Sequence, residues 1–90
     1  MGRLTEKEYL AEFRERLKRA RISRGLTQAE VAAFLGIESE DTYGSYERRS
    51  TLPLYYVPQA AKLLHVSLEW LLTGEGPTKR GLAVVGGIDG

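Results

Sequence analysis

Short polar side chains on one stretch are the residues of this chain best suited to chemistry. Asp41, Thr42 and Ser45 are spaced three and four apart, so a helix would place them on one face. Tyr43 and Tyr46 give the same helix an apolar face. Carboxylates and hydroxyls exchange hydrogen bonds with base edges, and a carboxylate accepts one from the cytosine amino group. The pattern therefore predicts recognition through hydrogen bonds.

Two short helices and a tight turn are expected to position this face. Thr27 and Glu30 have the spacing of a capping box that opens the first of them, and Gly36 suits its end. Ser39 is placed to cap the second helix, which we predict over Ser39–Glu47 and call the reading helix.

Three further helices are expected around this pair. A capping box at Thr5–Glu8 opens a long helix that ends at Gly25. Its apolar stripe consists of Leu10, Phe13, Leu17 and Ala20. Pro58 suits the first turn of a fourth helix, and Ser67 caps a fifth that stops at Gly74. The sequence thus predicts an all-α fold, a compact five-helix bundle.

Two sets of side chains on these outer helices have alternative interpretations. We expect Arg14, Arg16 and Lys18 to form a solvated charged face, with attraction to phosphate as the alternative. Trp70 is expected in the core, and contact with a partner subunit is the alternative.

Composition excludes several classes of function. The 90 residues fit one domain, the formal net charge is +1, and the absence of cysteine excludes disulfides and thiolate metal sites. His65 is the only histidine, and neither a glycine-rich phosphate loop nor a cluster of carboxylates is present. We therefore predict no enzyme activity, no metal, no cofactor and no small-molecule substrate. Without a long apolar run or a signal region, we expect a cytoplasmic protein that does not contact membranes.

Three motifs in a fixed order carry a resemblance to a known family. They are Arg21 to Gln28 (RISRGLTQ), Tyr46-Glu47, and Val66 to Leu72 (VSLEWLL). Together they resemble the helix-turn-helix domain of the lambdoid phage repressor and Cro family, also called the XRE family, over roughly residues 13–74. The resemblance implies a lambda-repressor-like DNA-binding domain in residues 1–74 and a flexible tail or linker in residues 75–90.

The resemblance also implies a function. It is that of a bacterial or phage-encoded regulator of transcription, expected to be a repressor, which binds a double-stranded DNA operator sequence-specifically. The reading helix would enter the major groove, and a homodimer would read two half-sites about one helical turn apart.

Several residue roles follow from the resemblance. Arg21 is implied to form a structural ion pair with Glu47. Thr27 and Gln28 are implied to bind backbone phosphate; alternatively, Thr27 only caps its helix and Gln28 is solvated. The loop after the reading helix is implied to bind phosphate as well, the alternative being exposed loop residues. These loop residues are Arg48, Arg49, Ser50 and Thr51.

The turn departs from the family pattern by one extra residue, at Ile37-Glu38. When the chain is aligned back from Glu47, the base-facing positions are occupied by Glu40, Asp41, Thr42 and Ser45. Glu40 and Asp41 alternatively do no more than complement the positive end of the helix dipole. Gly44 either permits close approach to DNA or marks crowding against a neighbouring helix.

The charge of this region supports a second hypothesis. From Gly25 to Glu47 there is no lysine or arginine, whereas five residues are acidic. An acidic reading helix repels phosphates. The alternative function is therefore that of an interaction module, antitoxin-like or an adaptor, which has the fold but does not bind DNA specifically.

Overall fold

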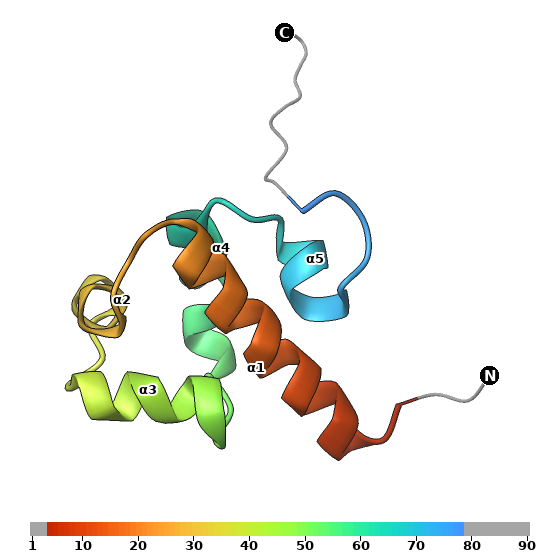
Figure 1. Ribbon diagram of the computed structural model, residues 1–90, viewed down its shortest axis with the longest axis horizontal. Helices are drawn as coiled ribbons and strands as arrows, with labels where there is room; N and C mark the ends of the chain where they lie inside the picture. Colours follow the sequence, from red (N-terminus) through yellow and green to blue (C-terminus); the bar gives the residue numbers. More distant parts are fainter. Residues whose placement is uncertain (1–3, 79–90) are drawn as a thin grey trace, which may run out of the picture.

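Five α-helices and one short 3-10 helix make up the part of the chain described by the computed structural model, residues 4–78 (Figure 1). No strand occurs in that range. The elements are α1 (Glu6–Ser23), α2 (Gln28–Leu35), α3 (Glu40–Arg48), η1 (Leu54–Tyr56), α4 (Val57–Leu64) and α5 (Leu68–Thr73). The predicted all-α, five-helix fold is confirmed.

The helices begin where the sequence places their caps. Thr5 and Thr27 each accept a hydrogen bond from the backbone amide three residues later, and the carboxylates of Glu8 and Glu30 accept one from the amide of the cap residue. Ser39 accepts from the Thr42 amide at 3.0 Å and so opens α3. These caps satisfy amides that the first helical turn leaves without intrahelical partners.

The turn from α2 to α3 is closed at a glycine and anchored by a buried isoleucine. Gly36 has a φ of +78°, and the Ile37 amide donates to the Ala32 carbonyl at 2.9 Å, which closes the helix end in a Schellman motif. Ile37 then packs into the core. The start of α3 is fixed by an apolar anchor as well as by the Ser39 cap.

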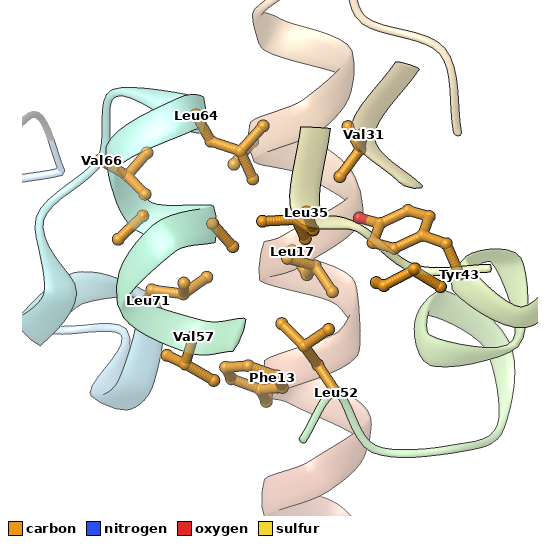
Figure 2. Packing of buried hydrophobic residues seen from close by; sticks show 14 of the residues in the cluster. Phe13, Leu17, Val31, Leu35, Tyr43, Leu52, Val57, Leu64, Val66 and Leu71 are labelled. Atoms are coloured by element: carbon orange, nitrogen blue, oxygen red, sulfur yellow. The ribbon is translucent and has the colours of Figure 1, made fainter. Parts of the chain in front are cut away.

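One hydrophobic core joins all five helices. Leu17 of α1 is fully buried, with side chains of α2, α3, α4 and α5 around it (Figure 2). The residues labelled in that view are Phe13, Leu17, Val31, Leu35, Tyr43, Leu52, Val57, Leu64, Val66 and Leu71. Trp70 is half-buried and packs against the edge of this core.

Two arginines of α1 were wrongly expected in a solvated face. Arg16 is only 8% exposed, and its guanidinium donates to the Leu71 and Leu72 carbonyls at 2.9 and 3.1 Å. Arg14 is half-buried and donates to the Ser50 carbonyl at 3.2 Å. Both guanidinium groups donate to backbone carbonyls outside α1, and the helical periodicity of the sequence does not reveal such distant partners. Lys18 is exposed, as expected.

The segment after α5 turns back toward the start of that helix. Ser67 donates from its hydroxyl to the Pro77 carbonyl and from its amide to the Thr78 carbonyl, both at 2.7 Å. The tail predicted over residues 75–90 thus begins with residues tied to α5, and residues 79–90 lie outside the described range. Among residues 4–78, no helix combines the length and apolar character needed to cross a bilayer.

His65 occupies a helix end that favours glycine. Its φ is +58°, and its amide donates to the Lys62 carbonyl at 3.2 Å as α4 ends. A side chain in this left-handed conformation costs about 1 kcal/mol. We expect His65→Gly to raise the free energy of unfolding by about that amount in a chemical denaturation experiment. The control is the opposite change, Gly36→Ala, which places a side chain on a left-handed residue and has no atom near the added methyl group. It should lower the free energy of unfolding by a similar amount. Equal stability of the wild type and both variants would contradict the argument.

Candidate nucleic-acid interface

The exposed side of α3 carries the polar residues that the sequence singled out. Tyr43, Gly44 and Glu47 are buried against the other helices. Asp41 is exposed, and Thr42 and Ser45 are half-buried on the opposite side of the helix. Figure 1 shows α3 along one edge of the molecule, where no other element covers its outer side. Three of the four expected base-reading residues therefore share one accessible face.

Glu40 does not share this face. It is exposed, but it precedes Tyr43, Gly44 and Glu47 by three, four and seven residues, so it continues the inward-facing side of α3 past its first turn. This placement fits the alternative in which Glu40 complements the helix dipole.

Hydrogen bonds within α3 fix what its hydroxyl groups offer to a ligand. The Ser45 hydroxyl donates to the Thr42 carbonyl at 2.7 Å, so its oxygen is left as an acceptor. The Ser39 hydroxyl lies 2.9 Å from Thr42 Oγ1, which leaves the Thr42 proton for an outside partner when Ser39 donates. Asp41 adds a carboxylate acceptor. The face therefore presents one donor flanked by two acceptors.

The Glu47 carboxylate joins α3 to two other helices. Arg21 of α1 donates to it twice, from Nε to Oε2 at 2.7 Å and from Nη2 to Oε1 at 3.0 Å. Gln28 of α2 donates to the same Oε1 at 3.1 Å. The Glu47 side chain is 1% exposed and that of Arg21 is 13% exposed. This geometry is the pairing that the family resemblance implies, and it is bidentate.

The environment of Glu47 keeps its carboxylate charged. Burial acts to raise its pKa, but the hydrogen bonds from Arg21 and Gln28 and the positive charge of Arg21 outweigh burial, so the pKa is lowered. The Arg21 pKa is raised, because its hydrogen bond to Glu47 outweighs its own burial.

Tyr43 lies beside this ion pair and is shielded from solvent. Its side chain is fully buried, and its hydroxyl makes no hydrogen bond to any described residue. Burial, followed by the nearby Glu47 carboxylate, raises the pKa of Tyr43 well above its usual range. Tyr43 thus supports α3 as a packed, neutral side chain, and its ring meets that of Tyr46 edge to face.

Gln28 and Arg48 converge over Gly44. A methyl group added at Gly44 would lie 2.9 Å from Nη1 of Arg48 and 3.1 Å from Oε1 of Gln28. Gly44 is therefore crowded by the neighbouring side chains of α2 and α3, which is one of the two alternatives for this glycine. Gln28, an expected phosphate ligand, is half-buried, and its amide group donates one hydrogen bond to Glu47, which leaves its second N–H for another partner.

The remaining expected phosphate ligands border α3. Thr27 is exposed at the start of α2, where its hydroxyl also caps that helix. Arg48 was expected in the loop, but it belongs to the last turn of α3, and Arg49 forms the C-cap. Both arginines and Thr51 are exposed, whereas Ser50 is half-buried. The Ser50 amide donates to the Ser45 carbonyl at 2.8 Å, which holds the loop against the helix.

Sequence reasoning missed Arg14 as a support of this loop. Its bond to the Ser50 carbonyl ties the segment after α3 to α1. Position 14 lies off the apolar stripe, next to Phe13, and a basic residue there looks identical to a solvated one in the sequence. Only the packing of α1 beside α3 distinguishes the two.

The charge state of Glu47 yields a prediction for stability against pH. A pKa that folding lowers contributes stability above the unfolded value, about 4.3 for glutamate, and this contribution is lost as the pH falls further. At pH 7 we expect Glu47→Gln to unfold with about 3 kcal/mol less free energy than the wild type, because Arg21 loses its buried partner. The difference in unfolding free energy between the wild type and Glu47→Gln, measured by urea denaturation, should narrow as the pH is lowered through 4. Glu38→Gln, at an exposed position, is the control; a gap independent of pH would contradict the assignment.

The crowding at Gly44 separates stability from DNA binding. Gly44→Ala raises helix propensity by about 1 kcal/mol, and its methyl group meets the end of Arg48 most closely; the amide of Gln28, which donates to Glu47, needs to give by only a few tenths of an ångström. We expect the melting temperature to stay the same or rise, while affinity for any DNA falls severalfold because Arg48 no longer holds its position. Circular dichroism measures the melting temperature, and fluorescence anisotropy measures the affinity for DNA. Unchanged affinity would contradict a contact between Arg48 and DNA.

Comparison with known proteins gives two matches. The family model described as "Helix-turn-helix" matches residues 17–71, which span the C-terminal part of α1, all of α2, α3 and α4, and most of α5. The chain is also similar to the "SPbeta prophage-derived uncharacterized HTH-type transcriptional regulator YonR" of Bacillus subtilis (strain 168). The two are 41% identical over 63 residues, which cover 69% of this chain and 57% of the relative.

Proposed function

This chain belongs to the helix-turn-helix family, and from this premise we propose that it binds double-stranded DNA sequence-specifically and regulates transcription, with repression as its expected role. The DNA-binding domain is residues 1–74, and its place of action is the cytoplasm of a bacterial cell. The observation that carries the proposal is the polar outer face of α3, held out from the core by the Arg21–Glu47 ion pair.

The face of α3 reads bases by matching donors to acceptors. The Thr42 hydroxyl is suited to donate to an acceptor such as guanine N7 or thymine O4, and Asp41 is suited to accept from the amino group of cytosine or adenine. Ser45 offers an acceptor one turn further along. The Asp41 carboxylate also repels phosphates, so it discriminates between sites more than it adds affinity.

Backbone phosphates are bound around the ends of α2 and α3. Thr27 and the amides of the first turn of α2 face one phosphate, with Gln28 alongside. Exposed cations at the end of α3 and donors in the following loop take others, which fixes the register of α3 in the groove. These residues are Arg48, Arg49, Ser50 and Thr51.

Regulation of transcription is supported by the similar prophage-derived protein, whose name describes an HTH-type transcriptional regulator. Binding as a homodimer follows from the geometry of such domains, in which one α3 fills one half-site and a second copy fills another about 34 Å away.

An interaction module without specific DNA binding is the second candidate. The observation that favours it is the exposed acidic group Glu38, Glu40 and Asp41 at the start of α3. The remaining acids are less available, because Glu47 is buried in its ion pair and Glu30 is engaged in the cap of α2.

The experiment that separates the two candidates is fluorescence anisotropy with the DNA upstream of the protein's own gene and with random DNA, over a salt series. A regulator binds the first more tightly, and its affinity falls steeply with salt as counterions are released. Equal, weak binding to both would instead support the interaction module.

Two substitutions test the roles of individual residues. We expect Thr42→Ala to reduce the preference for a selected duplex over random DNA by about tenfold, because one base contact is lost. Arg49→Ala should weaken binding to both duplexes alike and reduce the salt slope by about 1. Lys62→Ala, at an exposed lysine on α4, is the matched control. An equal loss on both duplexes for Thr42→Ala would refute the assigned register of α3.

A further inference from the structure

Of the two tyrosines in α3, Tyr46 borders the outer face of the helix. It lies one turn after Thr42 and three residues before Arg49, so it is a neighbour of both on the helix surface. The sequence placed Tyr46 together with Tyr43 on an apolar face. The structure separates the two, because Tyr43 is fully buried whereas Tyr46 is half-buried.

The ring of Tyr46 is held in place by the core. It packs against the edge of the hydrophobic cluster and meets the Tyr43 ring edge to face, with the ring centroids 6.4 Å apart. Figure 2 shows Tyr43 pointing into the core, so this neighbour is itself fixed. A ring held in this way loses little conformational freedom when its polar end binds a ligand.

The hydroxyl group of Tyr46 is not used within the domain. Among residues 4–78, the Tyr43 hydroxyl is the single buried side-chain polar group without a hydrogen-bond partner. The Tyr46 hydroxyl also has no partner in that range, and it is therefore accessible to solvent. The Tyr9 hydroxyl, by contrast, donates to the Leu72 carbonyl at 2.6 Å. Tyr46 thus presents a donor at a fixed position, available to an outside acceptor.

The surroundings of this donor favour an anionic acceptor. Exposed Arg48 and Arg49 follow Tyr46 at the end of α3 and make that end of the helix positive. Thr42 and Ser45, which have shorter side chains, occupy the outer face where base edges are met. Tyr46 lies at the flank of that face, which meets the wall of a groove, where the phosphates run.

We propose that Tyr46 binds a backbone phosphate at the wall of the major groove and donates its hydroxyl proton to a phosphate oxygen. The assignment rests on the proposed function, because it requires α3 in the groove. It adds a neutral phosphate ligand on α3 itself, between Thr42, which reads a base, and Arg49, which binds phosphate. Through the packing of its ring, Tyr46 connects that phosphate to the core.

Tyr46→Phe tests the contact, because it removes one oxygen atom and keeps the ring. In fluorescence anisotropy over a salt series, affinity for the upstream duplex and for random DNA should fall alike, by about fivefold, since a hydrogen bond is lost. The salt slope should equal that of the wild type, because a neutral donor releases no counterion. Arg49→Ala, which should reduce the slope by about 1, is the contrasting variant.

Tyr43→Phe is the matched control. It removes the same atom from the ring that touches Tyr46, but that hydroxyl is buried and has no described partner. DNA binding should equal that of the wild type, and the melting temperature should stay the same or rise, because a buried polar group without a partner is removed. An effect transmitted through the packing of the two rings would appear in both variants.

Three results would overturn the proposal. They are a Tyr46→Phe variant that binds both duplexes as tightly as the wild type, a loss confined to the upstream duplex, which indicates a base contact, and an equal loss in Tyr43→Phe. Each of them leaves the proposed function standing, provided that the wild type in the same titrations prefers the upstream duplex. A wild type without that preference would refute the proposed function and this contact together.

Discussion

The structure depends on one buried carboxylate, that of Glu47. It receives two hydrogen bonds from Arg21 and one from Gln28, so a single side chain of α3 is bound to α1 and α2. Removing a carboxylate and a guanidinium from water is costly, and a bidentate pair with a further donor offsets that cost. Such a pair also has a strict geometry. It therefore fixes the rotation of α3 about its axis, which decides the side chains that face outward.

The outward face follows from this rotation. With Glu47 and Tyr43 turned inward, Asp41, Thr42 and Ser45 are turned to solvent. The start of α3 is fixed as well, because Ile37 is buried and the Ser39 cap begins the helix at a defined position. The loop after α3 is held in turn by Arg14. Buried charges and apolar side chains thus fix the orientation of α3 and turn its polar face to solvent.

Local features were predictable from the sequence, whereas contacts between helices were not, except the Arg21–Glu47 pair, which the family resemblance implied. The caps at Thr5, Thr27 and Ser39 depend on residues three positions apart, so the sequence alone places them. The burial of Arg16 depends on the carbonyls of α5, more than fifty residues away. The bond from Gln28 to Glu47 was not predictable either, because nothing local shows that Glu47 lies within reach of the Gln28 amide. Sequence patterns identify a polar or charged residue but not the distant group with which it forms a hydrogen bond.

The two sides of α1 hold different helices in place. One side holds α3 through Arg21 and Arg14, and the other holds α5 through Arg16 and Tyr9. α1 therefore holds α3 and α5 in fixed positions relative to each other.

Amide chemical shifts recorded while a duplex from the upstream region is added would test the central claim, that the face set by Glu47 is the one that meets DNA. The account predicts the largest shifts at the start of α2 and from Asp41 to Thr51, with small changes at Glu12, Glu15 and Trp70. Large shifts confined to α1 and α5, with α3 unaffected, would contradict it.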